Sequence, residues 1–174
     1  MFKRTLLTII ILSSLNHAED SFSSEQFLGI EAGYGTVQSR NVIGIQESDK
    51  GVEFGFRIGA QNQEWRTTIS AHAFSKNSQE YFRTLLMFDK FVWSSHYKKD
   101  DVVFKPYLGG HVGWLKYSSK SGIEDSGFLY GGQAGIAWNV MREVDFDLGY
   151  RYSFSDVHSV DDIGSVVFAV NYLY

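Results

Sequence analysis

The sequence predicts an all-β fold, an eight-stranded antiparallel up-and-down transmembrane β-barrel with a polar, plugged lumen. One observation behind this prediction is strict alternation of apolar and polar residues, which is the pattern of a strand with two unlike faces. The other is the placement of glycine, since most of the 17 glycines fall on the polar faces. The chain has 174 residues, one proline and no cysteine, which is enough for one domain without disulfides.

Eight segments carry the alternation, separated by polar or glycine-containing connections. In the seventh, Phe146, Leu148 and Tyr150 alternate with two aspartates, a glycine and an arginine. The fourth is the least regular, because leucine and methionine share its polar face. Residues 93–104 are interpreted as two strand extensions around a turn at Lys98, Lys99, Asp100 and Asp101. The predicted strands are 26–36, 52–61, 65–75, 81–92, 105–117, 128–140, 143–154 and 163–174.

The glycines indicate that the polar face is the inner one. An eight-stranded barrel has a lumen only just wide enough for side chains, so long polar groups need neighbours without side chains. On a solvated outer face the same glycines would weaken the strands. Aromatic residues recur near the strand ends of the apolar face, as at the two boundaries of a membrane. The alternative is an exported, soluble β-barrel with these rings in its core. The ten glycines are Gly29, Gly33, Gly35, Gly55, Gly59, Gly109, Gly113, Gly131, Gly135 and Gly149.

Residues 1–18 are predicted to be a cleaved signal peptide, and residues 19–174 the outer-membrane β-barrel domain. Lys3 and Arg4 precede a short apolar run that ends before a cleavage site at Ala18. Both termini of the mature chain are predicted to be periplasmic, in which case four connections face outward. These connections are 37–50, 76–79, 118–127 and 155–162.

Two internal segments and the terminal strand resemble a known family. The segments are KPYLGGHVG at 105–113 and DLGYRY at 147–152. They are similar to the small eight-stranded outer-membrane barrels, the group of the OmpA-like transmembrane domain, OmpX/Ail and opacity-like surface proteins. The resemblance implies a Gram-negative cell surface, porin-like architecture, insertion by the outer-membrane assembly machinery with periplasmic chaperones, and a role carried by surface loops. It also implies a terminal assembly signal at Phe168, Val170, Tyr172 and Tyr174, although Tyr174 stands where phenylalanine is usual.

Charged residues on the inner face are expected to form a lumenal ion-pair network. Charges buried in a narrow lumen need partners, because an unpaired charge costs several kcal/mol. Pairing the strands about their connections places Arg66 opposite Asp89, His72 opposite Arg83, and Glu31 near an arginine. This network is predicted to plug the lumen, with a narrow ion or small-solute pore as the alternative. Its members are Glu31, Glu53, Arg57, Arg66, His72, Arg83, Asp89, Asp145, Asp147 and Arg151.

Catalytic and cofactor sites are not predicted. His158, Ser159, Asp161 and Asp162 resemble a hydrolase triad in composition, but no motif positions the serine as a nucleophile. A lipid-modifying enzyme is therefore a second alternative. No metal site is expected, and a net charge of −4 without a basic cluster argues against nucleic-acid binding.

The predicted function is a monomeric, non-enzymatic anchor in the outer membrane. Its surface loops would serve adhesion or interaction with a host, other cells or lipopolysaccharide. The expected partners are outer-membrane lipid, lipopolysaccharide and an extracellular ligand, which the sequence does not name.

Overall fold

The computed structural model describes residues 24–40, 46–76, 79–92, 98–99, 102–119, 124–158 and 160–174. The predicted signal peptide therefore lies outside the described residues. Within the described ranges the chain forms eight long strands and one strand of two residues. Their bounds are β1 (Glu25–Arg40), β2 (Gln46–Gln61), β3 (Trp65–Lys76), β4 (Gln79–Phe91), β5 (Lys98–Lys99), β6 (Val102–Ser119), β7 (Glu124–Met141), β8 (Val144–Ser155) and β9 (Val160–Leu173).

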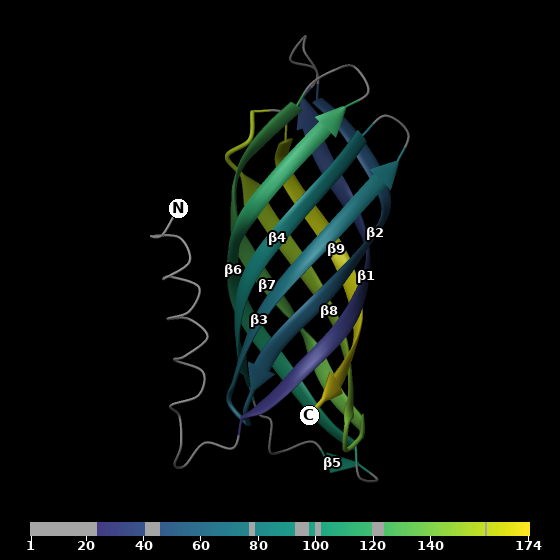
Figure 1. Cartoon of the computed structure of the whole chain (residues 1–174), viewed down its shortest axis with the longest axis vertical. Helices are drawn as coiled ribbons and strands as arrows, with labels where there is room; N and C mark the ends of the chain where they lie inside the picture. The colour runs from purple at the N-terminus through teal and green to yellow at the C-terminus, as the bar shows by residue number, and fades with distance from the viewer. Residues whose placement is uncertain are drawn as a thin grey trace, which may run out of the picture.

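The eight long strands close into an up-and-down barrel (Figure 1). Each is antiparallel to its neighbours, β4 pairs with β6, and β1 pairs with β9 to complete the circle. This confirms the predicted eight-stranded antiparallel fold. The described residues contain no helix that is long and apolar enough to cross a membrane.

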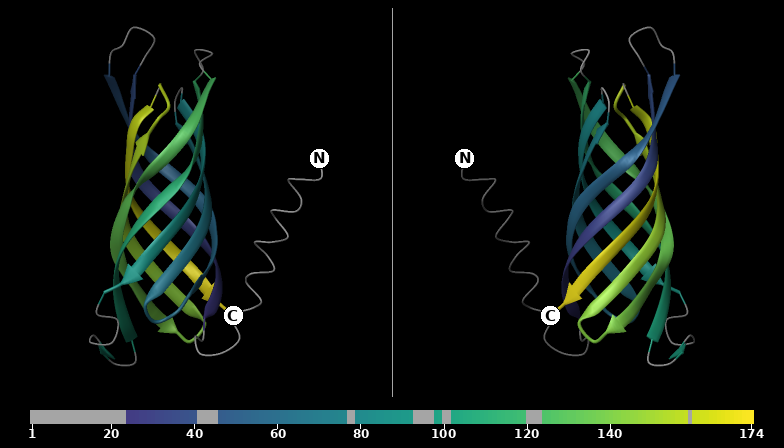
Figure 2. Two further views of the ribbon diagram at one scale, coloured as in Figure 1. Left: turned by 90° about the vertical axis from the view of Figure 1, so that its left-hand side faces the viewer. Right: turned by 90° about the vertical axis from the view of Figure 1, so that its right-hand side faces the viewer.

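The two ends of the barrel differ. The start of β1 and the C-terminus lie at one end, here called the terminal end (Figures 1 and 2). At the opposite end, the loop end, β1 is joined to β2, β3 to β4, β6 to β7 and β8 to β9. The loop end thus receives all four connections that the sequence predicts to be outside.

Several predicted boundaries were wrong. The first predicted connection, 37–50, is largely strand, because β1 continues to Arg40 and β2 begins at Gln46. Polar residues on both faces hide these extensions from an alternation criterion. Lys98 and Lys99 were expected in a turn, but they form β5 and pair with Val103 and Val102. Positions 93–97 and 100–101 of the same predicted segment lie outside the described residues.

The faces of the strands have the predicted orientation. Phe56 is 71% exposed on the outer wall, and leucine, isoleucine, tyrosine and tryptophan side chains surround the barrel at similar exposure. In contrast, Arg66 is 1% exposed, because its side chain points into the barrel. A wall of exposed apolar side chains around a charged interior is the arrangement of a barrel in lipid.

Glycine provides the space for the inward side chains. A Cβ atom on Gly109 would collide with the carboxylate of Asp89 and the backbone of Phe88. The next glycine, Gly110, points outward, and a Cβ there would meet nothing closer than the carbonyl oxygen of Gly131 at 3.6 Å. The two neighbours therefore occupy opposite environments on one strand.

Gly109→Ala is expected to lower the free energy of unfolding by about 1–3 kcal/mol, since the added methyl overpacks the lumen. Gly110→Ala, the matched control, should change stability by less than about 0.5 kcal/mol. Urea unfolding of the two variants in lipid vesicles measures both values. Equal effects at the two positions would show that the inner face is not close-packed at Gly109.

Candidate functional site

The ten residues predicted to form the lumenal network all lie inside the barrel. None of them is more than 4% exposed. Alternation along each strand accounts for this burial, because inward positions recur every second residue. They come from β1, β2, β3, β4 and β8, and are Glu31, Glu53, Arg57, Arg66, His72, Arg83, Asp89, Asp145, Asp147 and Arg151.

One half of the interior is crossed by a chain of ion pairs. Arg57 Nη1 lies 3.3 Å from Glu31 Oε2 and 3.4 Å from Asp147 Oδ2. Asp147 Oδ2 also lies 2.5 Å from Arg66 Nη1. Glu31 lies on β1, which pairs with β2, but the contacts of Asp147 on β8 with Arg57 on β2 and Arg66 on β3 join strands that do not pair with each other.

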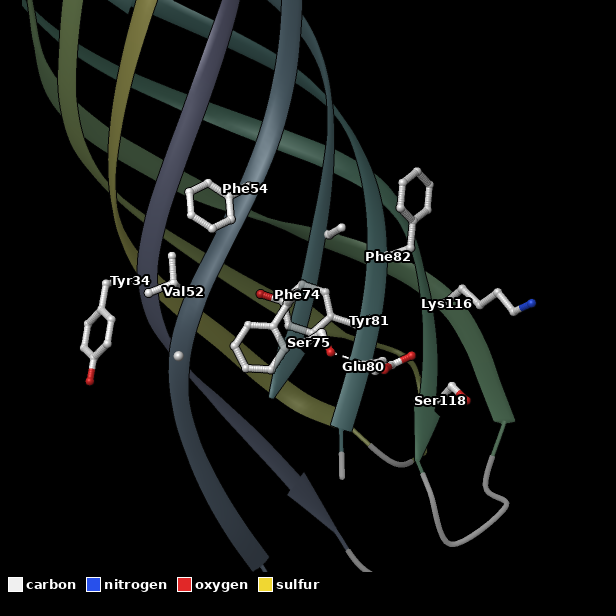
Figure 3. Close-up of a pocket in the computed structure, with 12 residues that line it drawn as sticks. Tyr34, Val52, Phe54, Phe74, Ser75, Glu80, Tyr81, Phe82, Lys116 and Ser118 are labelled. Carbon is white, nitrogen blue, oxygen red and sulfur yellow. Dashed lines mark hydrogen bonds between the residues drawn. The ribbon is translucent and has the colours of Figure 1, made fainter. Parts of the chain in front are cut away.

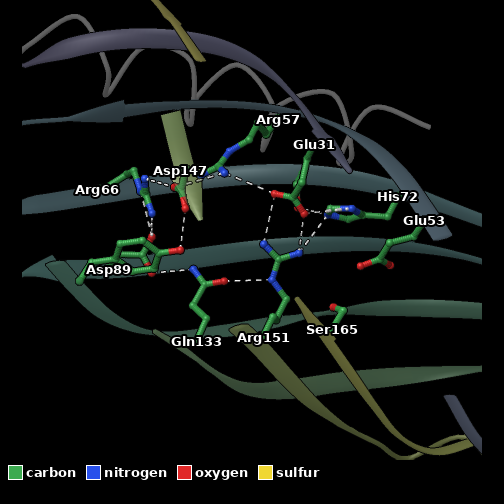
Figure 4. A network of polar contacts seen from close by, with 12 residues as sticks. Glu31, Glu53, Arg57, Arg66, His72, Asp89, Gln133, Asp147, Arg151 and Ser165 are labelled. Atoms are coloured by element: carbon green, nitrogen blue, oxygen red, sulfur yellow. Dashed lines mark hydrogen bonds and ion pairs between the residues drawn. The ribbon is translucent and has the colours of Figure 1, made fainter. Parts of the chain in front are cut away.

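The other half closes the chain into a circuit (Figure 4). Arg66 Nη2 lies 2.9 Å from Asp89 Oδ2, and Gln133 Nε2 donates to Asp89 Oδ1 at 2.6 Å. Arg151 Nε donates to Gln133 Oε1 at 3.0 Å. Arg151 Nη1 then returns to Glu31 Oε1 at 2.8 Å. We call the closed set the lumenal ring, formed by Glu31, Arg57, Asp147, Arg66, Asp89, Gln133 and Arg151.

A separate ion pair lies on the loop side of the ring. Arg83 Nη2 is 2.5 Å from Glu53 Oε1, and the hydroxyl of Tyr81 donates to Glu53 Oε2 at 2.7 Å. Arg83 Nη2 also donates to Ser165 Oγ at 3.5 Å, which links this pair to β9. The pair therefore connects β2, β4 and β9.

The charges of these groups balance. The ring and the separate pair together hold four arginines and four carboxylates, all buried. Removing one member would leave an unbalanced charge among buried groups, and such losses cost several kcal/mol. The opposing members are Arg57, Arg66, Arg83 and Arg151 against Glu31, Glu53, Asp89 and Asp147.

Two predicted members have partners other than those expected. Asp145 accepts a hydrogen bond from Gln61 Nε2 at 2.7 Å, and no ion pair joins it to an arginine within the described ranges. His72 sits opposite Arg83 in register, but its ring lies 2.7 Å from Ser70 Oγ and 3.3 Å from Glu31 Oε1.

Three contributors were missed by sequence reasoning. Gln133 bridges Asp89 and Arg151. The Tyr81 hydroxyl donates to Glu53, and the Tyr107 hydroxyl donates to Asp147 Oδ1 at 2.8 Å. Alternation places Gln133 and Tyr81 on the inner face. A search for opposite charges passes over them because they carry none.

Buried apolar side chains also lie inside the barrel, toward both ends and, as Leu85 and Met87, between Arg83 and Asp89 along β4; the predicted polar lumen did not include them. At the terminal end Phe91, Tyr107 and Ala137 pack together, and the Arg66 guanidinium lies 4.5 Å from the Tyr107 ring centroid. The signal for the larger group was the leucine and methionine on the inner face of the fourth predicted strand. This loop-end apolar cluster contains Val37, Phe74, Tyr81, Leu85, Met87, Leu115, Tyr117, Leu129, Val157, Val160 and Ile163.

The residues considered for catalysis are only partly covered by the described ranges, so the structure does not test them as a site. His158 is exposed, and Ser159 lies outside the described residues. A buried histidine, His111, lies 2.8 Å from Ser153 Oγ through its Nε2 atom. Among the described residues, no group of three potential ligands is arranged to hold a metal.

The predicted terminal assembly residues follow the outer wall of β9 and the last position of the chain. Phe168, Tyr172 and Tyr174 are exposed, and Val170 is half-buried. Their role in assembly stays a prediction.

No protein-family model and no curated protein matches the sequence. Solved structures do match. Neisserial surface protein A superposes with a TM-score of 0.63 at 20% identity, covering 84% of this chain and 96% of that one. The outer membrane protein OprH from P. aeruginosa gives 0.58 at 21% identity, covering 86% and 99%. The protein has the fold of the small eight-stranded outer-membrane barrels.

A third solved structure adds a bound molecule. Ail of Yersinia pestis, determined in complex with the heparin analogue sucrose octasulfate, superposes on this barrel with a TM-score of 0.51 at 18% identity, covering 87% and 99% of the two chains. At these identities the likeness establishes the fold alone. The neighbours are outer-membrane proteins, which supports an outer-membrane location for this barrel.

Proposed function

We propose that the protein is a closed, non-conducting anchor in the outer membrane, which presents the loop end to partners outside the cell. The observation that carries this proposal is the set of buried ion pairs and apolar clusters inside the barrel. The lumenal ring spans the interior, and apolar clusters lie on either side of it. An ion would have to separate buried pairs and cross apolar layers, so the lumen acts as a plug and the narrow pore is disfavoured.

The first hairpin supports a role for the loop end. The β2–β3 register ends at Glu53 and Phe74, whereas β1 and β2 remain paired as far as Arg40 and Gln46. The hairpin therefore rises beyond its neighbour β3 (Figure 2). In the proposed orientation, with both termini periplasmic, it stands outside the membrane.

The acidic residues at the loop end limit the class of extracellular partner that it can bind. Asp156 lies in the β8–β9 connection and Asp161 and Asp162 at the start of β9, and the chain as a whole has a net charge of −4. Such a surface disfavours a sulfated glycan of the kind bound in the Ail structure. It suits a cationic protein surface, or lipopolysaccharide phosphates bridged by divalent cations.

Replacing residues 38–48 with an Asn-Gly turn tests this function, because it shortens the hairpin while keeping Val37 paired with Asp49 and buried. We expect binding of whole cells to host cells or to immobilised lipopolysaccharide to fall at least about tenfold, because the hairpin would carry the main contacts. A tenfold fall corresponds to a loss of about 1.4 kcal/mol in binding free energy. Cell-adhesion counts and surface-plasmon measurements give the readouts.

A matched control changes the opposite end of the barrel. Arg142→Ala, in the β7–β8 turn, should leave binding unchanged. Both variants should keep the heat-modifiable gel mobility of a folded barrel. Undiminished binding without the hairpin would contradict loop presentation by this segment.

A further inference from the structure

The outer wall is hollowed near the loop end (Figure 3). A groove of about 840 Å³ is lined by Val52, Phe54, Ala73, Phe82 and Lys116, among others. A second groove of about 560 Å³ shares Phe54, Ala73 and Phe82 with the first. The two hollows therefore adjoin on the lipid-facing side of β1, β2, β3 and β4.

Small residues on β3 create this hollow. Ala73 lies opposite Phe54 of β2 and opposite Phe82 of β4 in the strand register. Two residues further along β3, away from the loop end, Ala71 lies opposite Phe56. Methyl groups thus run along β3, with Phe54 and Phe56 of β2 forming one wall of a channel parallel to the strand and Phe82 and Thr84 of β4 the other.

A gap between strands deepens the channel toward the loop end. β2 and β3 stop pairing beyond Glu53 and Phe74, so the groove there reaches the inward-facing rings of Phe74 and Tyr81. These rings stack with centroids 4.7 Å apart and form its floor. The hydroxyl of Tyr81 is bonded to Glu53 beneath them. The floor therefore separates the groove from the charged lumen.

The channel ends in polar groups. Lys116 of β6 lies beside Phe82 in register and is exposed on the outer wall. Glu80 is nearby but accepts a hydrogen bond from Ser75 Oγ at 3.2 Å. Over the described ranges no carboxylate forms an ion pair with Lys116. Its ammonium is therefore available to an anion at the level where the apolar wall gives way to the loops.

We infer that this groove binds an outer-leaflet lipid with a phosphate head group and several acyl chains. One acyl chain would lie along Ala71 and Ala73, and the phosphate would contact Lys116. A lipid is the occupant that fits, because Phe54 and Phe82 are 67% and 51% exposed on a wall that faces the bilayer. The anionic head group complements the lysine. The inference rests on the proposed outer-membrane orientation and extends the proposed function to a defined lipid contact.

Retention of lipid by the purified, folded barrel tests the inference. The probes are hexa-acylated diphosphoryl lipid A and phosphatidylcholine, each added in detergent and counted by native mass spectrometry. Wild type is expected to retain one lipid A and at least tenfold less phosphatidylcholine. Ala73→Phe, which fills the channel, and Lys116→Ala, which removes the cation, should each reduce lipid A retention at least tenfold.

Two variants elsewhere on the wall serve as matched controls. Ala134→Phe makes the same change at an exposed alanine of β7, and Lys90→Ala removes a lysine that lies 4.6 Å from the Trp65 ring centroid. Neither should alter retention. Equal loss in control and test variants, or equal retention of both lipids by wild type, would overturn the inference.

The lipid site and the adhesive role of the loop end are tested by separate measurements, so either can fail without the other. If adhesion still depends on the first hairpin while wild type retains no lipid A, the lipid site alone is refuted. Heat-modifiable mobility of Ala73→Phe confirms that a loss of retention does not arise from misfolding. Lys116→Ala provides an independent variant, because it removes an exposed side chain from a strand whose packing is unchanged.

Discussion

Arg66→Ala is expected to lower the free energy of unfolding by about 3–5 kcal/mol, the cost of leaving buried charges unpaired. The Arg66 guanidinium is the only group that joins Asp89 to Asp147 in the lumenal ring within the described residues. Both carboxylates are at most 2% exposed, so neither can be rehydrated without water entering the barrel. Urea unfolding in lipid vesicles, followed by tryptophan fluorescence and gel mobility, measures the loss.

The control for this variant is a buried carboxylate outside the ring. Asp145→Asn keeps a hydrogen-bonding group beside Gln61 and removes no ion pair, so it should cost less than about 1 kcal/mol. The double variant Arg66→Ala with Asp89→Ala should recover part of the loss, because Asp89 is the carboxylate that loses its ion pair, whereas Asp147 keeps Arg57. A loss below about 1 kcal/mol for Arg66→Ala would mean that water already occupies the lumen.

Phe56→Arg is expected to cost about 2–4 kcal/mol in a bilayer, the penalty for a charge on the lipid face near the midplane. Phe56 lies on the outer wall between Ile30 and Ala71, well inside the apolar band. The substitution would have little effect if this face were in water, since the ring is already exposed. The same unfolding measurement in lipid vesicles gives the value.

A position beyond the band provides the comparison. Gln38 is exposed on the outward face of β1, in the part of the hairpin that extends past the apolar wall. Gln38→Arg should change stability by less than about 0.5 kcal/mol. Equal penalties at the two positions would contradict the placement of the apolar wall in lipid.

The fold could be predicted from the sequence because each strand repeats the same alternation of outward apolar and inward polar or glycine residues. Glycine beside long polar residues indicated which face is inside, and Gly109 beneath Asp89 shows the physical reason. Local register also placed Arg66 opposite Asp89, because the short β3–β4 connection limits how the two strands can pair. These contacts join strands that are consecutive in the sequence, so the alternation and the length of the connection suffice to predict them.

The remaining contacts depend on barrel closure. Arg57 on β2 reaches Asp147 on β8, and the strands between them are β1 and β9. Such a pair follows from the curvature and stagger of the closed sheet, which no local pattern contains. The extended first hairpin was missed for another reason, because the residues that extend it are polar on both faces and break the alternation.

Single-channel recording in planar bilayers tests the closed lumen most directly. The buried, balanced ring and the flanking apolar clusters lead us to expect no steady conductance steps from the purified wild-type barrel at moderate voltage and physiological salt. The Arg66→Ala variant, provided that it keeps the gel mobility of a folded barrel, gives the conductance of a barrel with a disrupted lumenal ring for comparison. Large, steady steps from the wild type would contradict a plugged barrel and favour the narrow pore.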